Sequence, residues 1–307
     1  MIVISSGKSY LDIDGYASCI AYRELLKLRG IEAKFVSNAV VNSSITPSLI
    51  GLPFKTDEYE VMQGDKFIIL DTSNKYFFEE FIDYNNIVEI IDHHPGNEEY
   101  WNNLIGDKSH IEPIGSVATI IFEKYEQYGL LDKMDSGIAK LLMAAILDNT
   151  LNFTATITKD RDKLAYKKLE QIVNIKDFDE LYFKECQSTI VNNLENTIRN
   201  DLKIEDTSTL LPSILGQLLI YDIDSVMNKI DVINDIMNSY GTDWLLNIIS
   251  LKENNSYILC SNEFVINNLE KLFNVNAKEK FIVIKPNILR KEIMKKAIQE
   301  RKNKNGS

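Results

Sequence analysis

Two adjacent histidines follow an aspartate at the end of an apolar run, in the stretch VEIIDHHPGN. The chain has only three histidines, so this pair places most of its imidazole groups at one point. The preceding residues 88–91 are typical of a short buried strand. Polar side chains at the end of such a strand often form binding sites in α/β proteins, so Asp92, His93 and His94 are candidate site residues.

Aspartates follow other apolar runs in the same manner. Asp12 and Asp14 in YLDIDGYAS come after the run IVIS, and Asp71 ends the run KFIILD. Asp148 follows a helical apolar run in AAILDNTLNF. Carboxylate and imidazole ligands together suit manganese, iron, cobalt or magnesium better than an ion that prefers thiolates. Two such ions can activate a water molecule and neutralise a phosphoryl oxygen, so these residues predict a divalent metal site.

Each of these motifs also has a structural interpretation. A DxD sequence is commonly a turn that caps a helix, and Asp14 before GYASCIAY would serve as that N-cap. An adjacent histidine pair is more often solvated than bound to a metal, because short motifs match by chance. The ordered occurrence of all the motifs in one chain favours the metal site.

The elements that must position these residues alternate between strand and helix. Apolar runs predict strands at residues 2–5, 33–37, 66–71 and 88–91. Helical spacing predicts helices at 16–30 and 116–129, each ending on a glycine. This alternation is typical of an α/β fold with a doubly wound, mainly parallel sheet. The carboxyl ends of its strands meet in one crevice, where the candidate residues would gather.

Composition excludes several classes of protein. The 307 residues carry a formal net charge of -11, which argues against binding duplex nucleic acid through a basic surface. No segment resembles a signal peptide or a membrane span, and the three cysteines are far apart. We therefore expect a cytoplasmic protein without a membrane partner.

The second half predicts a smaller α/β domain. Apolar runs indicate strands at 215–223, 243–251, 255–262 and 280–286, with helices such as FVINNLEKLF between them. The polar stretch 187–206 would connect the two halves, with helical parts. The predicted domains are residues 1–187, which hold the metal site, and residues 188–307, which comprise the connector and a substrate-binding domain.

The order of the motifs carries a resemblance to a known family. DIDGYAS, ILDTS, IDHHP and AAILDNTLNF resemble the four motifs of the DHH phosphoesterases. EPIGSVATIIFEKY and residues 145–169 resemble segments of manganese-dependent (family II) inorganic pyrophosphatases and their exopolyphosphatase, or prune-like, relatives. In the second half, NDLKI and PNILRKEIMKKA resemble the D-x-K and SRKKQ elements of the same branch.

The resemblance implies a hydrolase that cleaves phosphoanhydride bonds of pyrophosphate or short polyphosphates with water activated by two divalent ions. The ions would be Mn²⁺, with Mg²⁺ or Co²⁺ as alternatives, and the partner would be a small anionic phosphate compound. The implied metal ligands are Asp12 on one ion, Asp14 on the other, Asp71 between them, and His93 and Asp148 on the second ion.

Further roles implied by the resemblance concern the substrate. His94 would face the phosphate, and Asp92 would orient the neighbouring imidazole. Lys203, Arg290 and Lys291 would contact substrate phosphates, so the active site would lie in a cleft between the two domains. The alternative for Lys291 is a solvated basic helix end, because charge runs are usually solvated.

Two departures from the family pattern affect the substrate. Lys8 stands four residues before Asp12, where the pyrophosphatases have a metal-binding histidine, and a protonated lysine cannot be a ligand. Thr72 stands where they have a histidine after the bridging aspartate. Both changes favour an altered substrate preference, with Lys8 offering its ammonium group to a longer anion.

Two alternative functions stay open. One is a DHH phosphodiesterase acting on short oligonucleotides or cyclic dinucleotides, although the chain has no Gly-Gly-His element and His110 is expected in a loop. The other is a regulator that binds a phosphate or nucleotide without catalysis. The sequence also leaves open the chain length of the substrate, the physiological metal and whether the protein is a homodimer.

Overall fold

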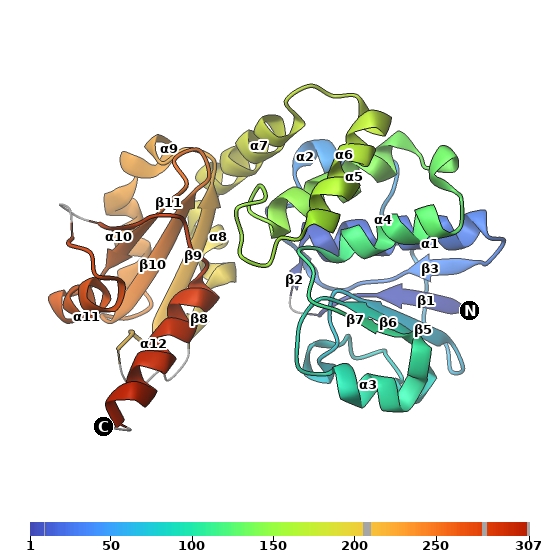
Figure 1. Cartoon of the computed structure of the whole chain (residues 1–307), viewed down its shortest axis with the longest axis horizontal. Coiled ribbons are helices and arrows are strands. Elements are labelled where there is room, and N and C mark those ends of the chain that lie inside the picture. The colour runs from blue at the N-terminus through green and yellow to red at the C-terminus, as the bar shows by residue number, and fades with distance from the viewer. Residues whose placement is uncertain (9, 205–209, 278–280, 306–307) are drawn as a thin grey trace. The chain divides into compact units, whose positions relative to one another are not determined.

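The computed structural model describes residues 1–8, 10–204, 210–277 and 281–305. Contacts divide the chain into two compact units, residues 1–179 and residues 180–307 (Figure 1). The division falls within the helix α7 (Phe178–Asn192), and the domain boundary predicted at residues 187 and 188 falls within the same helix. None of the helices in the described part of the chain is long and apolar enough to cross a membrane.

A parallel five-stranded sheet forms the centre of the first unit, in the order β3-β1-β5-β6-β7. The predicted doubly wound fold is confirmed, because helices cover both faces of this sheet (Figure 1). The strands are β1 (Ile2–Ser5), β3 (Ala33–Phe35), β5 (Lys66–Leu70), β6 (Ile87–Asp92) and β7 (Ser109–Ile111). One face carries the helices α1 (Ile13–Leu28), α4 (Val117–Gln127), α5 (Ser136–Asn149) and α6 (Asp160–Val173), and the other carries α3 (Glu98–Ile105).

Both predicted helix ends are confirmed by the backbone. Gly30 and Gly129 follow α1 and α4 with φ angles of 76° and 65°, a conformation that glycine adopts without steric cost. Shorter elements complete the unit. They are β2 (Tyr10–Leu11), which pairs with β4 (Val40–Val41), α2 (Pro47–Ile50), η1 (Lys75–Phe77), η2 (Tyr84–Asn86), η3 (Gly106–Lys108) and η4 (Leu131–Lys133).

The order of the strands creates a switch point beside β1. The chain moves from β1 to β3 on one side and then crosses to β5 on the other. Ligands in open α/β sheets bind at such a point, outside the carboxyl ends of the strands. The segments after β1, β5 and β6 contain most of the predicted metal ligands, so the topology accounts for their convergence.

The second unit is built on a mixed five-stranded sheet in the order β12-β11-β10-β9-β8. Its strands are β8 (Lys203–Ile204), β9 (Ile214–Ile220), β10 (Trp244–Ser250), β11 (Asn255–Cys260) and β12 (Ile282–Ile284). The four predicted strands are therefore confirmed, although Lys280 at the start of the last one lies outside the described residues. The helices are α8 (Leu194–Asp201), α9 (Asp224–Met227), α10 (Ile230–Asn238), α11 (Glu263–Phe273) and α12 (Arg290–Asn305).

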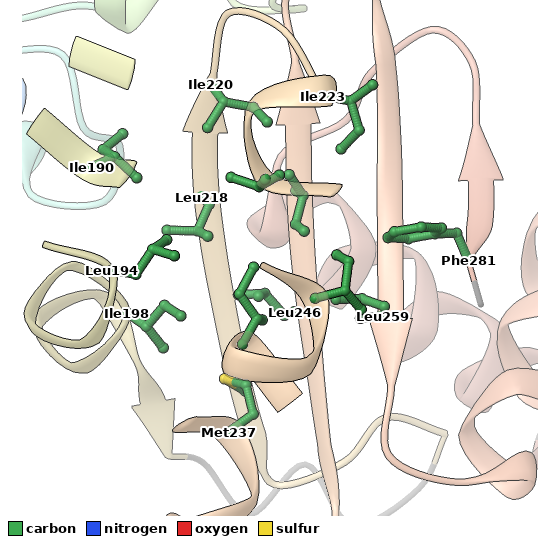
Figure 2. Packing of buried hydrophobic residues seen from close by; sticks show 14 of the residues in the cluster. Ile190, Leu194, Ile198, Leu218, Ile220, Ile223, Met237, Leu246, Leu259 and Phe281 are labelled. Atoms are coloured by element: carbon green, nitrogen blue, oxygen red, sulfur yellow. The ribbon is translucent and has the colours of Figure 1, made fainter. Parts of the chain in front are cut away.

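Two apolar layers stabilise this sheet. On one face, Ile198 of α8 and Met237 of α10 pack with strand residues such as Leu218 and Leu246 (Figure 2). On the other face, residues of α11 and α12 form a second buried cluster with the strands. The predicted connector, residues 187–206, forms the end of α7, α8 and β8, while residues 205 and 206 lie outside the described chain.

Candidate metal centre

Asp71 is the residue that directly follows β5. Its backbone N–H donates to the Ile91 carbonyl at 2.9 Å, and its φ angle is 61°, which aspartate tolerates better than most residues other than glycine. The side chain is buried, and Oδ1 has no hydrogen-bond partner among the described residues. This atom lies 3.5 Å from Nε2 of His93. A buried, unpaired carboxylate oxygen is costly unless a cation or donor binds it.

His93 presents a metal-binding nitrogen to this oxygen. Its Nδ1 lies 3.1 Å from the carbonyl oxygen of Ile114, and a carbonyl can only accept, so Nδ1 carries the proton of the neutral ring. Nε2 then has its lone pair directed at Asp71 Oδ1. Two acceptors facing each other at 3.5 Å are a poor hydrogen bond, but their separation suits two ligands of one ion with bonds of ~2.1 Å.

Asp92 orients the second histidine. Its buried Oδ1 accepts the backbone N–H groups of His93 at 2.8 Å and His94 at 3.1 Å, and it lies 2.8 Å from Nδ1 of His94. Burial alone would raise the pKa of Asp92, but the hydrogen bond and charge of the His94 ring lower it below its ordinary value. The His94 side chain is 58% exposed. Its Nδ1 is fixed by Asp92, so the rest of the ring is held in one orientation toward incoming ligands.

The first-motif aspartates lie at the start of α1. Asp12, not Asp14, is the N-cap, because its Oδ1 accepts the N–H of Gly15 at 3.0 Å and its backbone is extended. The structural alternative, in which Asp14 caps this helix, is wrong, since the helix begins at Ile13 and Asp14 lies in its first turn.

Asp14 is fully buried against the first turn of α4. It accepts hydrogen bonds from the Ser116 hydroxyl at 2.8 Å and from the N–H groups of Val117 and Ala118, each at 2.9 Å. The positive end of the α4 dipole also favours a carboxylate there. Burial nevertheless raises the pKa of Asp14 to about 6, although these hydrogen bonds lower it.

The carboxylates of this cluster oppose one another. The pKa of Asp71 is well above its ordinary value, first because of burial and then because of the negative charges of Asp14 and Asp12. Burial and the neighbouring Asp14 also raise the pKa of Asp12. Asp71, His93 and His94 each offer one ligand atom within 4.8 Å of the others. A divalent cation would remove this repulsion, so the donor set fits a hard or intermediate metal ion.

Three further residues of the first unit were predicted to belong to the site or to affect its substrate. Asp148 lies in the last turn of α5, and its role as a ligand stays a prediction. Lys8 has an exposed side chain, and its backbone N–H donates to the carbonyl of Phe77 at 2.7 Å. Thr72 is buried.

The predicted phosphate-binding residues belong to the second unit. Arg290 begins α12, and its Nη1 donates to Oδ2 and to the backbone carbonyl of Asp201, both at 2.6 Å. Lys203 is exposed on β8, and the side chain of Lys291 lies outside what the structure describes. Sequence reasoning missed Asp201, although it is the first residue of the D-x-K element. The phosphate contacts of Lys203, Arg290 and Lys291 stay predictions.

Sequence reasoning also missed a buried carboxylate near the centre. Asp162 in α6 accepts the N–H groups of Gly115 at 3.1 Å and Lys159 at 2.7 Å, and the Thr119 hydroxyl at 2.6 Å. It stands in the charged run KDRDK, which looks solvated in the sequence. The loop prediction for His110 is wrong, because this residue lies in β7.

Comparisons with known proteins agree with this architecture. Residues 2–146 match the family described as DHH family, N-terminal domain, and this match lies within the first unit. A manganese-dependent inorganic pyrophosphatase of Methanocaldococcus jannaschii is 25% identical over 248 residues, covering 76% of this chain and 78% of that protein. One from Bacillus subtilis is 26% identical over 304 residues, covering 94% and 95%.

A solved structure shares the fold of the whole chain. It is a Methanococcus jannaschii protein described as a family II inorganic pyrophosphatase, with a TM-score of 0.65 and 21% sequence identity. The match covers 97% of this chain and 100% of that one. The predicted combination of a DHH domain and a smaller C-terminal sheet domain is therefore confirmed.

Proposed function

We propose that this protein is a manganese-dependent hydrolase of phosphoanhydrides, with pyrophosphate or a short polyphosphate as its substrate. The observation that carries the proposal is the buried Oδ1 of Asp71, which lacks a hydrogen bond within the described chain and faces Nε2 of His93 at 3.5 Å. The relatives named manganese-dependent inorganic pyrophosphatases support the choice of metal and reaction.

The residues of the first unit divide into holding and orienting groups. Asp12, Asp14, Asp71, His93 and Asp148 would hold the ions. Bound there, the ions would supply Lewis acidity and an activated water. The carbonyl of Ile114 keeps the proton of His93 on Nδ1, so that its other nitrogen can bind metal.

His94 would act on the substrate from the edge of this centre. Its ring is exposed and is held through Nδ1 by the buried Asp92, and we propose that Nε2 meets a phosphate oxygen or a leaving group. Asp92 lies against Nδ1 of His94 and so fixes the side of the imidazole that would meet an anionic phosphate. Lys203, Arg290 and Lys291 of the second unit would supply further cationic contacts.

The replacement of two family histidines by Lys8 and Thr72 affects the expected chain length of the substrate. A lysine in place of a metal-binding histidine removes one neutral ligand and adds a cationic group, which favours a longer anion. We therefore expect short polyphosphates to be hydrolysed at rates that rival or exceed that of pyrophosphate. We also propose a cytoplasmic location, since the sequence has only three cysteines, far apart and without a CxxC pair. A homodimer stays a prediction, which light scattering can test.

The decisive experiment is a substrate panel with controlled metal. Pyrophosphate, tripolyphosphate, long polyphosphate and a dinucleotide are assayed with Mn²⁺, with Mg²⁺ and in chelator. Hydrolysis of a phosphoanhydride that requires a divalent ion supports the proposal. Full activity in chelator refutes the metal mechanism, and preferential cleavage of the dinucleotide supports the phosphodiesterase alternative. Pyrophosphate as by far the best substrate would contradict the inference from Lys8 and Thr72.

A further inference from the structure

One loop contacts two of the expected metal ligands at once. It consists of residues 114–118, which lead into α4 and are called the 114–118 loop below. The carbonyl of Ile114 holds Nδ1 of His93, while Ser116, Val117 and Ala118 donate to the carboxylate of Asp14. A shift of this loop would therefore move an imidazole and a carboxylate of the metal centre together.

Asp162 fixes the middle of this loop. Its Oδ2 accepts the N–H of Gly115 at 3.1 Å, between the residue that holds His93 and the residues that hold Asp14. The contact is close, because a Cβ atom built on Gly115 would lie 2.5 Å from Oδ2 of Asp162. Only glycine can occupy this position without movement of the carboxylate or of the loop.

Asp162 is itself held rigidly. It is 0% exposed, its Oδ2 also accepts the N–H of Lys159, and its Oδ1 accepts the Thr119 hydroxyl at 2.6 Å. The side chain thus connects the start of α6, through Lys159, with the first turn of α4, through Thr119. The Gly115 N–H and the Thr119 hydroxyl, whose bonds to Asp162 are buried, would be left unsatisfied in the interior if the carboxylate were removed.

We propose that Asp162 is a positioning residue for the metal centre, acting through the 114–118 loop on His93 and Asp14. This inference rests on the proposed function, because it requires that these two residues bind the metal. The hydrogen bond of Asp162 to this loop is to the backbone N–H of Gly115, so its effect is transmitted by backbone groups of the loop. Outer partners that orient metal ligands commonly change metal affinity by 10- to 100-fold when they are removed.

The test compares metal affinity with stability in the full chain. Asp162→Ala removes all three acceptor contacts, whereas Asp162→Asn keeps a carbonyl for the N–H groups and an amide that can donate to Thr119. The matched control is Asp65→Ala. Asp65 is also buried, and it accepts the N–H of Met62 at 2.8 Å and the Tyr59 hydroxyl at 3.1 Å, but it precedes β5 at the opposite end of the strand from Asp71.

Mn²⁺ alone is titrated into each metal-free variant by calorimetry, and thermal unfolding is measured in chelator. We expect Asp162→Ala to bind Mn²⁺ about 10- to 100-fold more weakly than the wild type, and Asp162→Asn to recover most of that affinity. Asp65→Ala should lose thermal stability and keep its Mn²⁺ affinity. If Asp162→Ala does not fold, Thr119→Val removes one of the three bonds, and it should weaken Mn²⁺ binding in the same direction.

The outcomes separate this inference from the proposed function. Unchanged Mn²⁺ affinity in Asp162→Ala, or in Thr119→Val where the first variant does not fold, overturns the positioning role while the wild type still binds metal. A comparable loss of affinity in Asp65→Ala also overturns it, because general destabilisation would then explain the effect. Absence of Mn²⁺ binding in the wild type overturns the proposed function itself, and the positioning role with it.

Discussion

Replacing Asp71 by asparagine should stabilise the metal-free protein and weaken its metal binding. The Asp71 side chain is 8% exposed, lies near the charges of Asp12 and Asp14, and has an Oδ1 without a hydrogen bond in the described chain. Asparagine has the same shape without the charge, and it also tolerates the φ angle of 61°. The change therefore relieves repulsion without creating a cavity.

The size of this effect has an upper limit set by protonation. The ordinary pKa of the Asp71 carboxyl is 3.8, so protonating it at pH 7 costs about 4 kcal/mol. If repulsion by its neighbours cost more than this, the carboxylate would take up a proton and lose its charge. We expect Asp71→Asn to recover about half of this limit, ~2 kcal/mol, as a higher free energy of unfolding. For a chain of 307 residues, that corresponds to a rise in Tm of about 3 °C.

The gain in stability from Asp71→Asn should increase as the pH rises. The pKa of Asp71 is raised in the folded state, so the folded protein binds the proton more tightly than the unfolded chain. The metal-free wild type therefore loses stability as the pH rises from 3.8 toward the folded pKa. Because Asp71→Asn lacks this group, its advantage should be near zero around pH 4 and should grow toward pH 7.

The assay is thermal and denaturant unfolding in chelator over this pH range, followed by addition of Mn²⁺. An ion that binds only the folded form adds ~2.7 kcal/mol at a concentration of 100 times Kd, and this gain should be far smaller in Asp71→Asn. Asp65→Asn is the control. The hydrogen bond from the Met62 N–H lowers the pKa of Asp65, although burial opposes this. The contribution of Asp65 to the free energy of unfolding should therefore be present at neutral pH and lost as the pH falls.

Two results would refute this reasoning. One is an Asp71→Asn variant that is less stable than the wild type in chelator at pH 7. The other is a stability difference that does not change with pH. Either result would mean that the buried carboxylates do not repel one another in the metal-free protein.

Three further changes probe other parts of the machinery. His94→Ala should reduce kcat by about 10²- to 10⁴-fold with unchanged Mn²⁺ affinity, whereas a large loss of affinity would make His94 a ligand. Arg290→Ala should reduce kcat/KM about a hundredfold, ~3 kcal/mol, without altering Mn²⁺ binding. The variant should also be less stable, because Asp201 loses its ion pair with Arg290. Wild-type kinetics would show that Arg290 has no part in catalysis. Gly15→Ala should weaken Mn²⁺ binding in titrations. The added Cβ would lie 2.7 Å from the Ser6 hydroxyl and 3.4 Å from the Asp71 carboxylate. Wild-type affinity in this variant would show that Ser6 moves aside freely.

The sequence predicted the central strands because their apolar runs report burial directly. The run 66–71 predicted β5, and Asp71 at the end of that run marked the candidate site. The strand β7 was missed because its three residues are only half buried and include His110. The alternative interpretation of Asp14 as a helix cap was wrong because local sequence does not show which of two aspartates has the extended backbone.

The candidate site was predictable where side chains follow strands, and it was not predictable where support comes from a distant helix. Asp162 stands among charged residues that a solvated helix also contains, and its burial depends on the loop at Gly115, far away in the sequence. Asp201 was missed for a related reason. Its partner Arg290 lies 89 residues further along the chain, and no local pattern joins the two.

The parallel sheet has a consequence for the kinetics of folding. Asp71 and His93 follow the neighbouring strands β5 and β6, and Asp12 lies in the segment after β1; these three strands adjoin only when the sheet has formed. No short peptide of this chain therefore contains the site, and an ion has nothing specific to bind while the parallel strands are still separate. Manganese should consequently act late, slowing the unfolding rate while leaving the folding rate almost unchanged.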